Sequence, residues 1–309
     1  MQVRKFLNMK NKTIVIGYAS AILASALFGS VPTIAKPMIS NINILLLTSF
    51  AYLIASATFT PIAHRTKSAF VKKDYWILLV IAICGATIAP LLYFLGLNQS
   101  NASDTSLLSN AEIVFTVLLA LIFFKERLKP IGFVAVGLVL FGVTIVTTNL
   151  QVSNSLFQIN TGHLLILGAT AFWALDNNLS RIILTRVDTA RLVQLKSAIG
   201  GAIMLVTIFA LGIPLQISAK QIPYLILLSV LGFGGSLYFF LQSLKRIGTI
   251  RTVVLFSMSS VFGLVFAGIF LHEKISVFQI IAIVIMLTGI YLINRKESMK
   301  HAESTSFGF

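Results

Sequence analysis

Phe124-Lys125-Glu126-Arg127-Leu128 follows one apolar segment of this chain and opens the next. Leu271-His272-Glu273-Lys274-Ile275 does the same 147 residues later, and Gly142 and Gly289 keep this offset in the segments that follow. The chain therefore contains two repeats, each with five apolar spans. Because five is an odd number, membrane spans arranged in this way would place the second repeat upside down relative to the first.

The composition indicates a membrane protein. Of the 309 residues, 57% are hydrophobic and only 11% are charged, whereas soluble domains contain about 25% charged residues. Apolar stretches of about 18 or more residues with few charges indicate membrane helices. The sequence predicts ten transmembrane helices in an all-α integral membrane fold, at roughly 14–35, 42–61, 74–97, 102–124, 130–148, 161–183, 190–213, 220–244, 249–271 and 276–294.

These spans divide the chain into four parts. The first repeat occupies residues 1–148 and the second occupies 161–294. Residues 149–160 are expected to form an external linker, and 295–309 a cytoplasmic tail.

The net charge of +15 reflects orientation in the membrane. If the N-terminus is cytoplasmic, 20 of the 24 Lys and Arg residues lie in cytoplasmic loops or tails. The external loops hold only Lys36, Lys220 and Lys274, and Lys196 lies within a span. This bias predicts that both termini are cytoplasmic in a multi-pass protein of the plasma membrane. It argues against a surface that binds nucleic acid.

Glu112 lies at the middle of the fourth span, two residues after Asn110. An unpaired carboxyl group at the bilayer centre costs a few kcal/mol, so ionisable residues there usually face a cavity or a partner. Glu112 is therefore a candidate for carrying a proton or holding an ammonium group, with Asn110 as a hydrogen-bonding neighbour. The alternative is a carboxyl group that serves helix packing.

The sixth span contains the most polar interior stretch. Trp173 lies one helical turn before Asp176 and Asn177, so an aromatic wall and polar groups share a face, and Asn178 follows directly. This combination suits a site for a small polar molecule, and the alternative is a polar contact between helices. Lys196 in the seventh span lies at a depth similar to that of Asp176, which predicts a charge pair. Alternatively, Lys196 extends to the membrane interface.

Two spans carry interruptions at matching positions of the repeats. Pro90 lies in the third span, and glycines cluster at 232–235 in the eighth. Such interruptions in corresponding spans are pointers to a transporter site. Tyr93 and Tyr238, which follow them, are expected to face each other's half near the central axis, with simple aromatic packing as the alternative.

Together the repeat, the ten spans and the Glu-bearing junctions resemble the drug/metabolite transporter superfamily of EamA type. Lys125 and His272 depart from the glycine usual there, and Glu112-Ile113-Val114-Phe115 lacks a proline, so a straighter fourth helix is expected. The resemblance implies a central cavity between two five-helix halves and no cofactor. Members mostly export or exchange small metabolites, including amino acids. We expect Glu126 and Glu273 to cap or order the turn into the next helix.

These features predict a secondary transporter, an exporter of a small polar metabolite such as an amino acid. The two halves would rock around a midplane site, with Glu112 as the carrier of a coupling proton. A passive channel on the same fold is the alternative. The sequence lacks a cluster of His, Asp or Cys at a membrane interface, which disfavours a membrane enzyme. The expected partners are the substrate and the lipid bilayer, with no metal and no nucleic acid.

Overall fold

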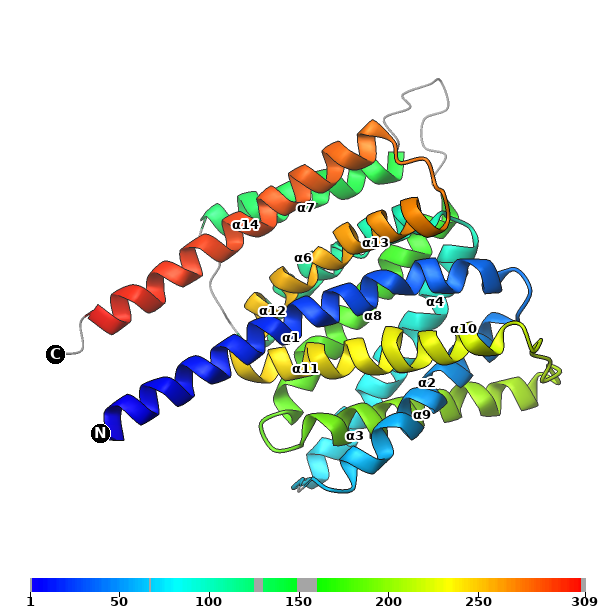
Figure 1. Ribbon diagram of the computed structural model, residues 1–309, viewed down its shortest axis with the longest axis horizontal. Coiled ribbons are helices and arrows are strands. Elements are labelled where there is room, and N and C mark those ends of the chain that lie inside the picture. Colours follow the sequence, from blue (N-terminus) through cyan, green and yellow to red (C-terminus); the bar gives the residue numbers. More distant parts are fainter. Residues whose placement is uncertain (1, 67, 125–129, 149–159, 307–309) are drawn as a thin grey trace.

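The computed structural model describes residues 2–66, 68–124, 130–148 and 160–306, and all regular elements in these ranges are helices (Figure 1). Apolar chain in a bilayer must satisfy its backbone polar groups internally, which a helix does. The helices of the first repeat are α1 (Gln2–Ile39), α2 (Ile44–Ala63), α3 (Lys72–Ile83), η1 (Cys84–Ile88), α4 (Ala89–Asn98), α5 (Ala102–Leu108), α6 (Ala111–Phe124) and α7 (Pro130–Thr148).

The second repeat follows the same order. Its helices are α8 (Thr161–Ile183), α9 (Thr189–Ala210), α10 (Ile222–Leu227), η2 (Leu228–Gly235), α11 (Ser236–Ile247), α12 (Thr249–Phe256), α13 (Met258–Phe270) and α14 (Val277–Ser306). The elements η1 and η2 are π-helical segments within otherwise continuous helices. The predictions for Glu126 and for residues 149–159 of the linker expected at 149–160 lie outside the described residues.

The prediction of an all-helical membrane protein is confirmed. Within the described residues, six helical runs are long and apolar enough to cross a membrane. The other predicted spans correspond to α5–α6, α7, α8 and α14, so ten crossings and cytoplasmic termini stay predictions. Both chain ends lie at the same end of the bundle (Figure 1), which we call the termini end. We call the other end the distal end.

The irregular segments follow the repeat. Shifting η1 by 147 residues places it within η2, at the interruptions that Pro90 and the glycines at 232–235 predict. The same shift places Asn110, in the turn between α5 and α6, on Ser257, between α12 and α13. The expectation of a straighter fourth helix is wrong. The Ser109 hydroxyl donates to the Thr105 carbonyl at 2.8 Å, a contact that bends helices even without proline.

The first helix of each repeat packs mainly against the other repeat. Helix α1 packs against α11 and α13, and α8 packs against α4 and α6. We therefore distinguish the α1 bundle (α1, η2 and α10–α13) from the α8 bundle (α8, η1 and α3–α6). Helices α2 and α9 form one pair between the repeats, and α7 and α14 form another along one edge (Figure 1).

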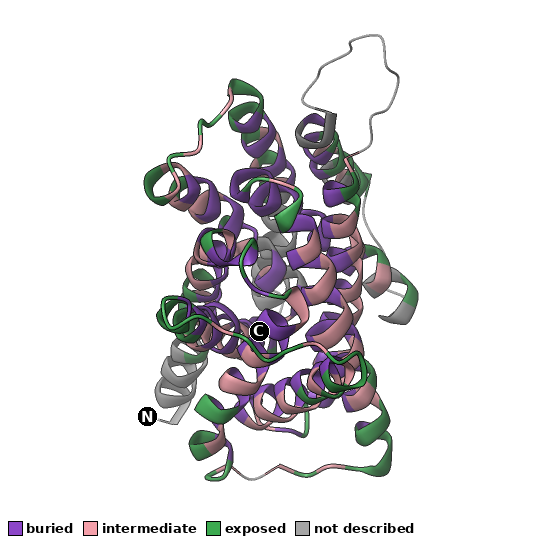
Figure 2. Ribbon diagram, turned by 90° about the vertical axis from the view of Figure 1, so that its right-hand side faces the viewer, coloured by how far each residue is buried: buried purple, intermediate pink, exposed green. Residues whose placement is uncertain are grey.

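Contacts between the two bundles differ at the two ends. At the distal end, α1 packs on α4 and α5, and α5 packs closely on α13. The corresponding contacts at the termini end are sparser. They join α8 to α11 and α12, and α6 to α12. Close approach of the bundles needs small residues, because a Cβ on Gly263 of α13 would lie 2.5 Å from the Ser106 Cβ of α5. Buried residues line the helix faces that point inward, and exposed residues gather on the connections (Figure 2).

Candidate functional site

A cavity lies between the α1 and α8 bundles. Helices α2 and α9 complete its wall. Five residues predicted from the sequence line it: Glu112, Trp173, Asp176, Asn177 and Lys196. The fold thus brings together groups from the fourth, sixth and seventh predicted spans.

Asp176 and Lys196 form a buried ion pair in this cavity. The Lys196 ammonium group donates to one Asp176 oxygen, and the Ser180 hydroxyl donates to the other at 3.0 Å. Lys196 is 1% exposed and Asp176 is 2% exposed. The predicted pair is therefore present, and Lys196 points into the protein rather than to the interface. Gly85 packs flat against the Asp176 carboxyl group, which leaves no space for a Cβ at that position.

Glu112 is the second acid of the cavity. It is buried in the first turn of α6, just after the α5–α6 turn, and Asn177 donates to its Oε1 at 2.5 Å. Lys196 already pairs with Asp176, and no ion pair involving Glu112 occurs among the described residues. The cavity thus combines one internally neutralised pair with a carboxyl group whose one side-chain hydrogen bond, within the described part of the chain, comes from an amide. Such a group can exchange a proton or accept a cationic ligand group.

The π-helical segment η1 exposes a backbone acceptor beside these charges. The Ala89 N–H bonds one residue further back than in an α-helix, and Pro90 has no N–H, so neither reaches the Gly85 carbonyl. Two side chains use this free carbonyl instead: the Tyr52 hydroxyl donates at 3.2 Å and the Trp173 Nε1–H at 3.1 Å. The bulge therefore ties α2 and α8 to the third span at the cavity wall.

Aromatic rings form much of the remaining wall. Phe28 packs edge-on against Trp173, with ring centroids 5.5 Å apart, and also lies 5.2 Å from Phe256. Tyr52 packs against Phe233 with a centroid separation of 5.0 Å. Rings of this kind give a ligand apolar and cation–π contacts. Since each comes from a different helix, movement between the bundles would change the shape of the cavity.

Two of the predicted asparagines do not line the cavity. The Asn110 side chain accepts from the Ser260 hydroxyl at 2.6 Å and donates to the Met286 sulfur at 3.3 Å, which connects the α5–α6 turn to α13 and α14. Asn178 donates to the Thr116 carbonyl at 3.2 Å and so connects α8 to α6. Both are buried contacts between helices. Their proposed contact with substrate stays a prediction.

The two predicted tyrosines also lie away from the cavity lining. Tyr93 is fully buried behind Trp173, with ring centroids 5.1 Å apart. Tyr238 stacks on Phe59 at 5.1 Å, and its hydroxyl accepts a hydrogen bond from Gln242. Tyr93 thus supports a ring of the cavity wall from behind.

The sequence analysis did not single out Tyr52, Gly85 or the phenylalanines of the wall. Gly85 had a usable signal, because it lies five residues before Pro90 and its carbonyl would lose a donor in a π turn. The phenylalanines had none, since 24 of them occur throughout the chain. Within the described residues, no three His, Cys, Asp or Glu side chains group as metal ligands would.

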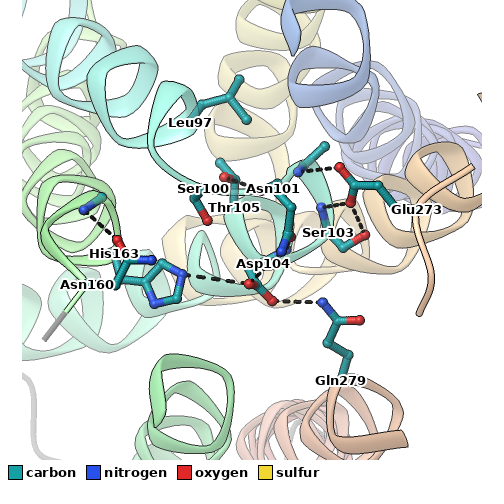
Figure 3. Close-up of polar contacts among 12 residues, drawn as sticks. Leu97, Ser100, Asn101, Ser103, Asp104, Thr105, Asn160, His163, Glu273 and Gln279 are labelled. Carbon is teal, nitrogen blue, oxygen red and sulfur yellow. Dashed lines mark hydrogen bonds and ion pairs between the residues drawn. The ribbon is translucent and has the colours of Figure 1, made fainter. Parts of the chain in front are cut away.

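A second polar cluster lies at the distal end (Figure 3). The Asp104 carboxylate accepts from Gln279 at 2.7 Å and from Asn101 at 2.8 Å, and it lies 3.7 Å from His163 Nε2. Glu273 accepts hydrogen bonds from the first residues of α5. It therefore caps a helix, as predicted, but one from the other repeat rather than the helix that follows it.

The comparisons with known proteins agree with this architecture. The EamA-like transporter family matches twice, at residues 15–148 and 160–295. An "Uncharacterized transporter" of Methanothermobacter thermautotrophicus is 32% identical over 293 residues, covering 90% of this chain and 85% of the relative. The "Uncharacterized transporter YetK" of Bacillus subtilis is 20% identical over 290 residues, covering 89% and 86%.

One solved crystal structure shares the fold, with a TM-score of 0.66 at 17% identity, covering 92% of this chain and 96% of the other. The two family matches correspond to the two repeats seen in the helix order, and together they cover most of the chain. The chain therefore belongs to the EamA-like transporter family.

Proposed function

We propose that the chain is a secondary transporter that exports a small polar metabolite by alternating access. The observation that carries this proposal is the cavity itself, where Glu112, Asp176 and Lys196 lie buried among apolar membrane helices. Burying three ionisable groups there costs free energy, and a helix bundle that binds no ligand would be more stable with apolar residues in their place. A binding site for a polar solute accounts for the cost.

The cavity suits a small molecule with charged groups of both signs, such as an amino acid. Its lining combines two carboxyl groups, an ammonium group and aromatic rings, and sites for small molecules typically pair a few polar groups with apolar walls. A substrate ammonium group would lie near Glu112 and the ring faces. A substrate carboxylate would compete with Asp176 for Lys196, so binding would open the internal ion pair.

The unequal packing of the two ends supports alternating access over a continuous pore. The bundles are closely packed at the distal end and sparsely at the termini end. Inverted repeats allow the mirror-related arrangement, in which the packed and sparse ends exchange. Because the first helices are exchanged between repeats, the α1 and α8 bundles are the units that would rock, rather than the two sequential halves.

We assign Glu112 the role of coupling group. Its carboxyl group would take up a proton on one side and release it on the other as the bundles rock. In proteoliposomes with a pH gradient, the wild type should accumulate substrate and Glu112→Gln should not, while still exchanging substrate without a gradient. Unchanged gradient-driven uptake by Glu112→Gln would remove this role.

The substrate and the site can be identified together. We suggest a thermal-shift screen of purified protein against amino acids, amines, nucleosides and sugars. A ligand of the cavity should raise the melting temperature of the wild type but not of Asp176→Asn. Asp188→Asn is the matched control, because Asp188 caps α9 away from the cavity and asparagine caps equally well. A hit that survives in Asp176→Asn would place binding elsewhere.

A further inference from the structure

The turn between α4 and α5 is held from both sides at the distal end. On one side, the Lys36 ammonium group donates to the carbonyl oxygens of Leu97, at 2.7 Å, and of Ser100. Leu97 lies in the last turn of α4, where a helix leaves carbonyls without α-helical donors, and Ser100 lies in the turn that follows. A cation from α1 thus satisfies the carboxyl end of a helix in the other bundle.

On the other side, Glu273 satisfies the start of α5 (Figure 3). Its Oε1 accepts from the Ala102 N–H at 2.8 Å, and its Oε2 accepts from the Ser103 N–H at 2.9 Å and the Ser103 hydroxyl at 2.5 Å. Such charge-assisted hydrogen bonds are about twice as strong as neutral ones. Lys36 and Glu273 also attract each other electrostatically.

Both contacts cross the interface that must separate for the cavity to open distally. Lys36 belongs to α1 and Glu273 follows α13, so both lie on the α1 bundle. Their partners lie on α4 and α5 of the α8 bundle, or in the turn between them. Asp104 differs, because its contacts are with Asn101 of its own turn, His163 of its own bundle and Gln279 of α14.

The two side chains are suited to a contact that forms and breaks. Lys36 and Glu273 are half-buried, so water can replace their protein partners when the bundles part. The backbone groups they satisfy would also reach water. Charged groups at this depth therefore favour the distally closed state over the distally open state, and both states stay accessible.

We propose that Lys36 and Glu273 form a distal latch, which holds the α1 and α8 bundles together and keeps the cavity closed to that side. The latch rests on the proposed transport function, because it acts on the opening step of alternating access. Lys36 and Glu273 are positioning residues: they contact no substrate and set which side the cavity faces.

A cysteine in the cavity can report the side to which it is open. We suggest Leu237→Cys, a half-exposed cavity residue, in protein whose single native cysteine is replaced by Cys84→Ala. A membrane-impermeant thiol reagent is applied to membrane vesicles of each orientation. Wild-type latch residues should give labelling mainly from the termini end. Glu273→Gln and, independently, Lys36→Met should move the ratio of the two labelling rates toward the distal side by roughly tenfold.

Two control variants remove a charge without touching the latch. Lys274→Gln changes the exposed neighbour of Glu273, and Lys220→Met changes an exposed lysine of another distal connection. Both should label as the wild type does. Size-exclusion profiles check folding, and either latch variant alone suffices if the other does not fold.

The outcomes distinguish a failure of the latch proposal from a failure of the proposed transport function. A shift in Glu273→Gln or Lys36→Met, absent in both controls, supports the latch. Unchanged labelling in both latch variants, in protein that still shows substrate counterflow, overturns the latch and leaves the transport proposal standing. Equal labelling from both sides before any latch substitution overturns the latch, and if the protein also shows no substrate counterflow, it indicates a continuous pore and overturns the transport proposal as well.

Discussion

Removing one partner of the Asp176–Lys196 pair should lower the free energy of unfolding far more than replacing both partners. Lys196→Met keeps the length of the side chain but leaves the buried Asp176 carboxylate with the Ser180 hydroxyl as a hydrogen-bond donor. Removing one partner of a buried ion pair typically costs about 3–5 kcal/mol, because the other charge stays desolvated and unpaired. At about 2–4 °C per kcal/mol for chains of 150–250 residues, the melting temperature should fall by at least roughly 6 °C.

The double variant tests the reason for this cost. In Lys196→Met with Asp176→Asn, no charge of the pair remains, and asparagine can still bond to Ser180. We expect the double variant to recover at least half of the loss, which gives a coupling free energy of about 2 kcal/mol or more in the double-mutant cycle. It should nevertheless lose ligand binding, because both site charges are gone.

Thermal unfolding in detergent, followed by circular dichroism, measures all four proteins of the cycle. A fall of less than about 1 kcal/mol in the free energy of unfolding of each single variant would refute the interpretation that the pair is desolvated. That interpretation is equally refuted if the losses of the two single variants add up in the double variant. Additive losses would mean that Asp176 and Lys196 contribute independently, as solvated groups do.

Two further substitutions test the surroundings. Gly85→Ala should lower the melting temperature and abolish ligand binding, because its methyl group would collide with the Asp176 carboxyl group. Gly137→Ala is the control and should change neither, because a Cβ there meets nothing within 4 Å. Equal effects of the two substitutions would contradict the expected collision. Asp74→Asn should destabilise by only about 1 kcal/mol, because the Arg186 side chain that donates to the carboxylate at 2.5 and 3.2 Å is 40% exposed and partly solvated pairs contribute little. The same unfolding assay measures this loss, and an unchanged melting temperature would contradict a stabilising pair.

Much of the fold follows from periodic features of the sequence. The repeat offset of 147 residues predicts where the π-helical segments lie, because Pro90 and the glycines at 232–235 disturb equivalent turns. Depth in the membrane likewise predicts the Asp176–Lys196 pair. Both inferences use only positions along a helix, which a single sequence contains.

Other features depend on how helices meet, which the sequence does not show. Three such features join segments that are distant in the sequence. Helices α1 and α8 each pack in a bundle of the other repeat, Asn110 contacts α13 and α14, and Glu273 caps α5. The interruption before Glu112 was missed because no proline marks it. The hydrogen bond from Tyr52 to the carbonyl that η1 frees also joins distant segments.

Counterflow of the compound identified by thermal shift distinguishes alternating access at the cavity from passive conduction. Proteoliposomes loaded with unlabelled compound are diluted into a trace of labelled compound. Alternating access at the cavity predicts saturable uptake that internal compound stimulates and that Asp176→Asn abolishes. Uptake that rises linearly with concentration, without stimulation by internal compound, would contradict the account.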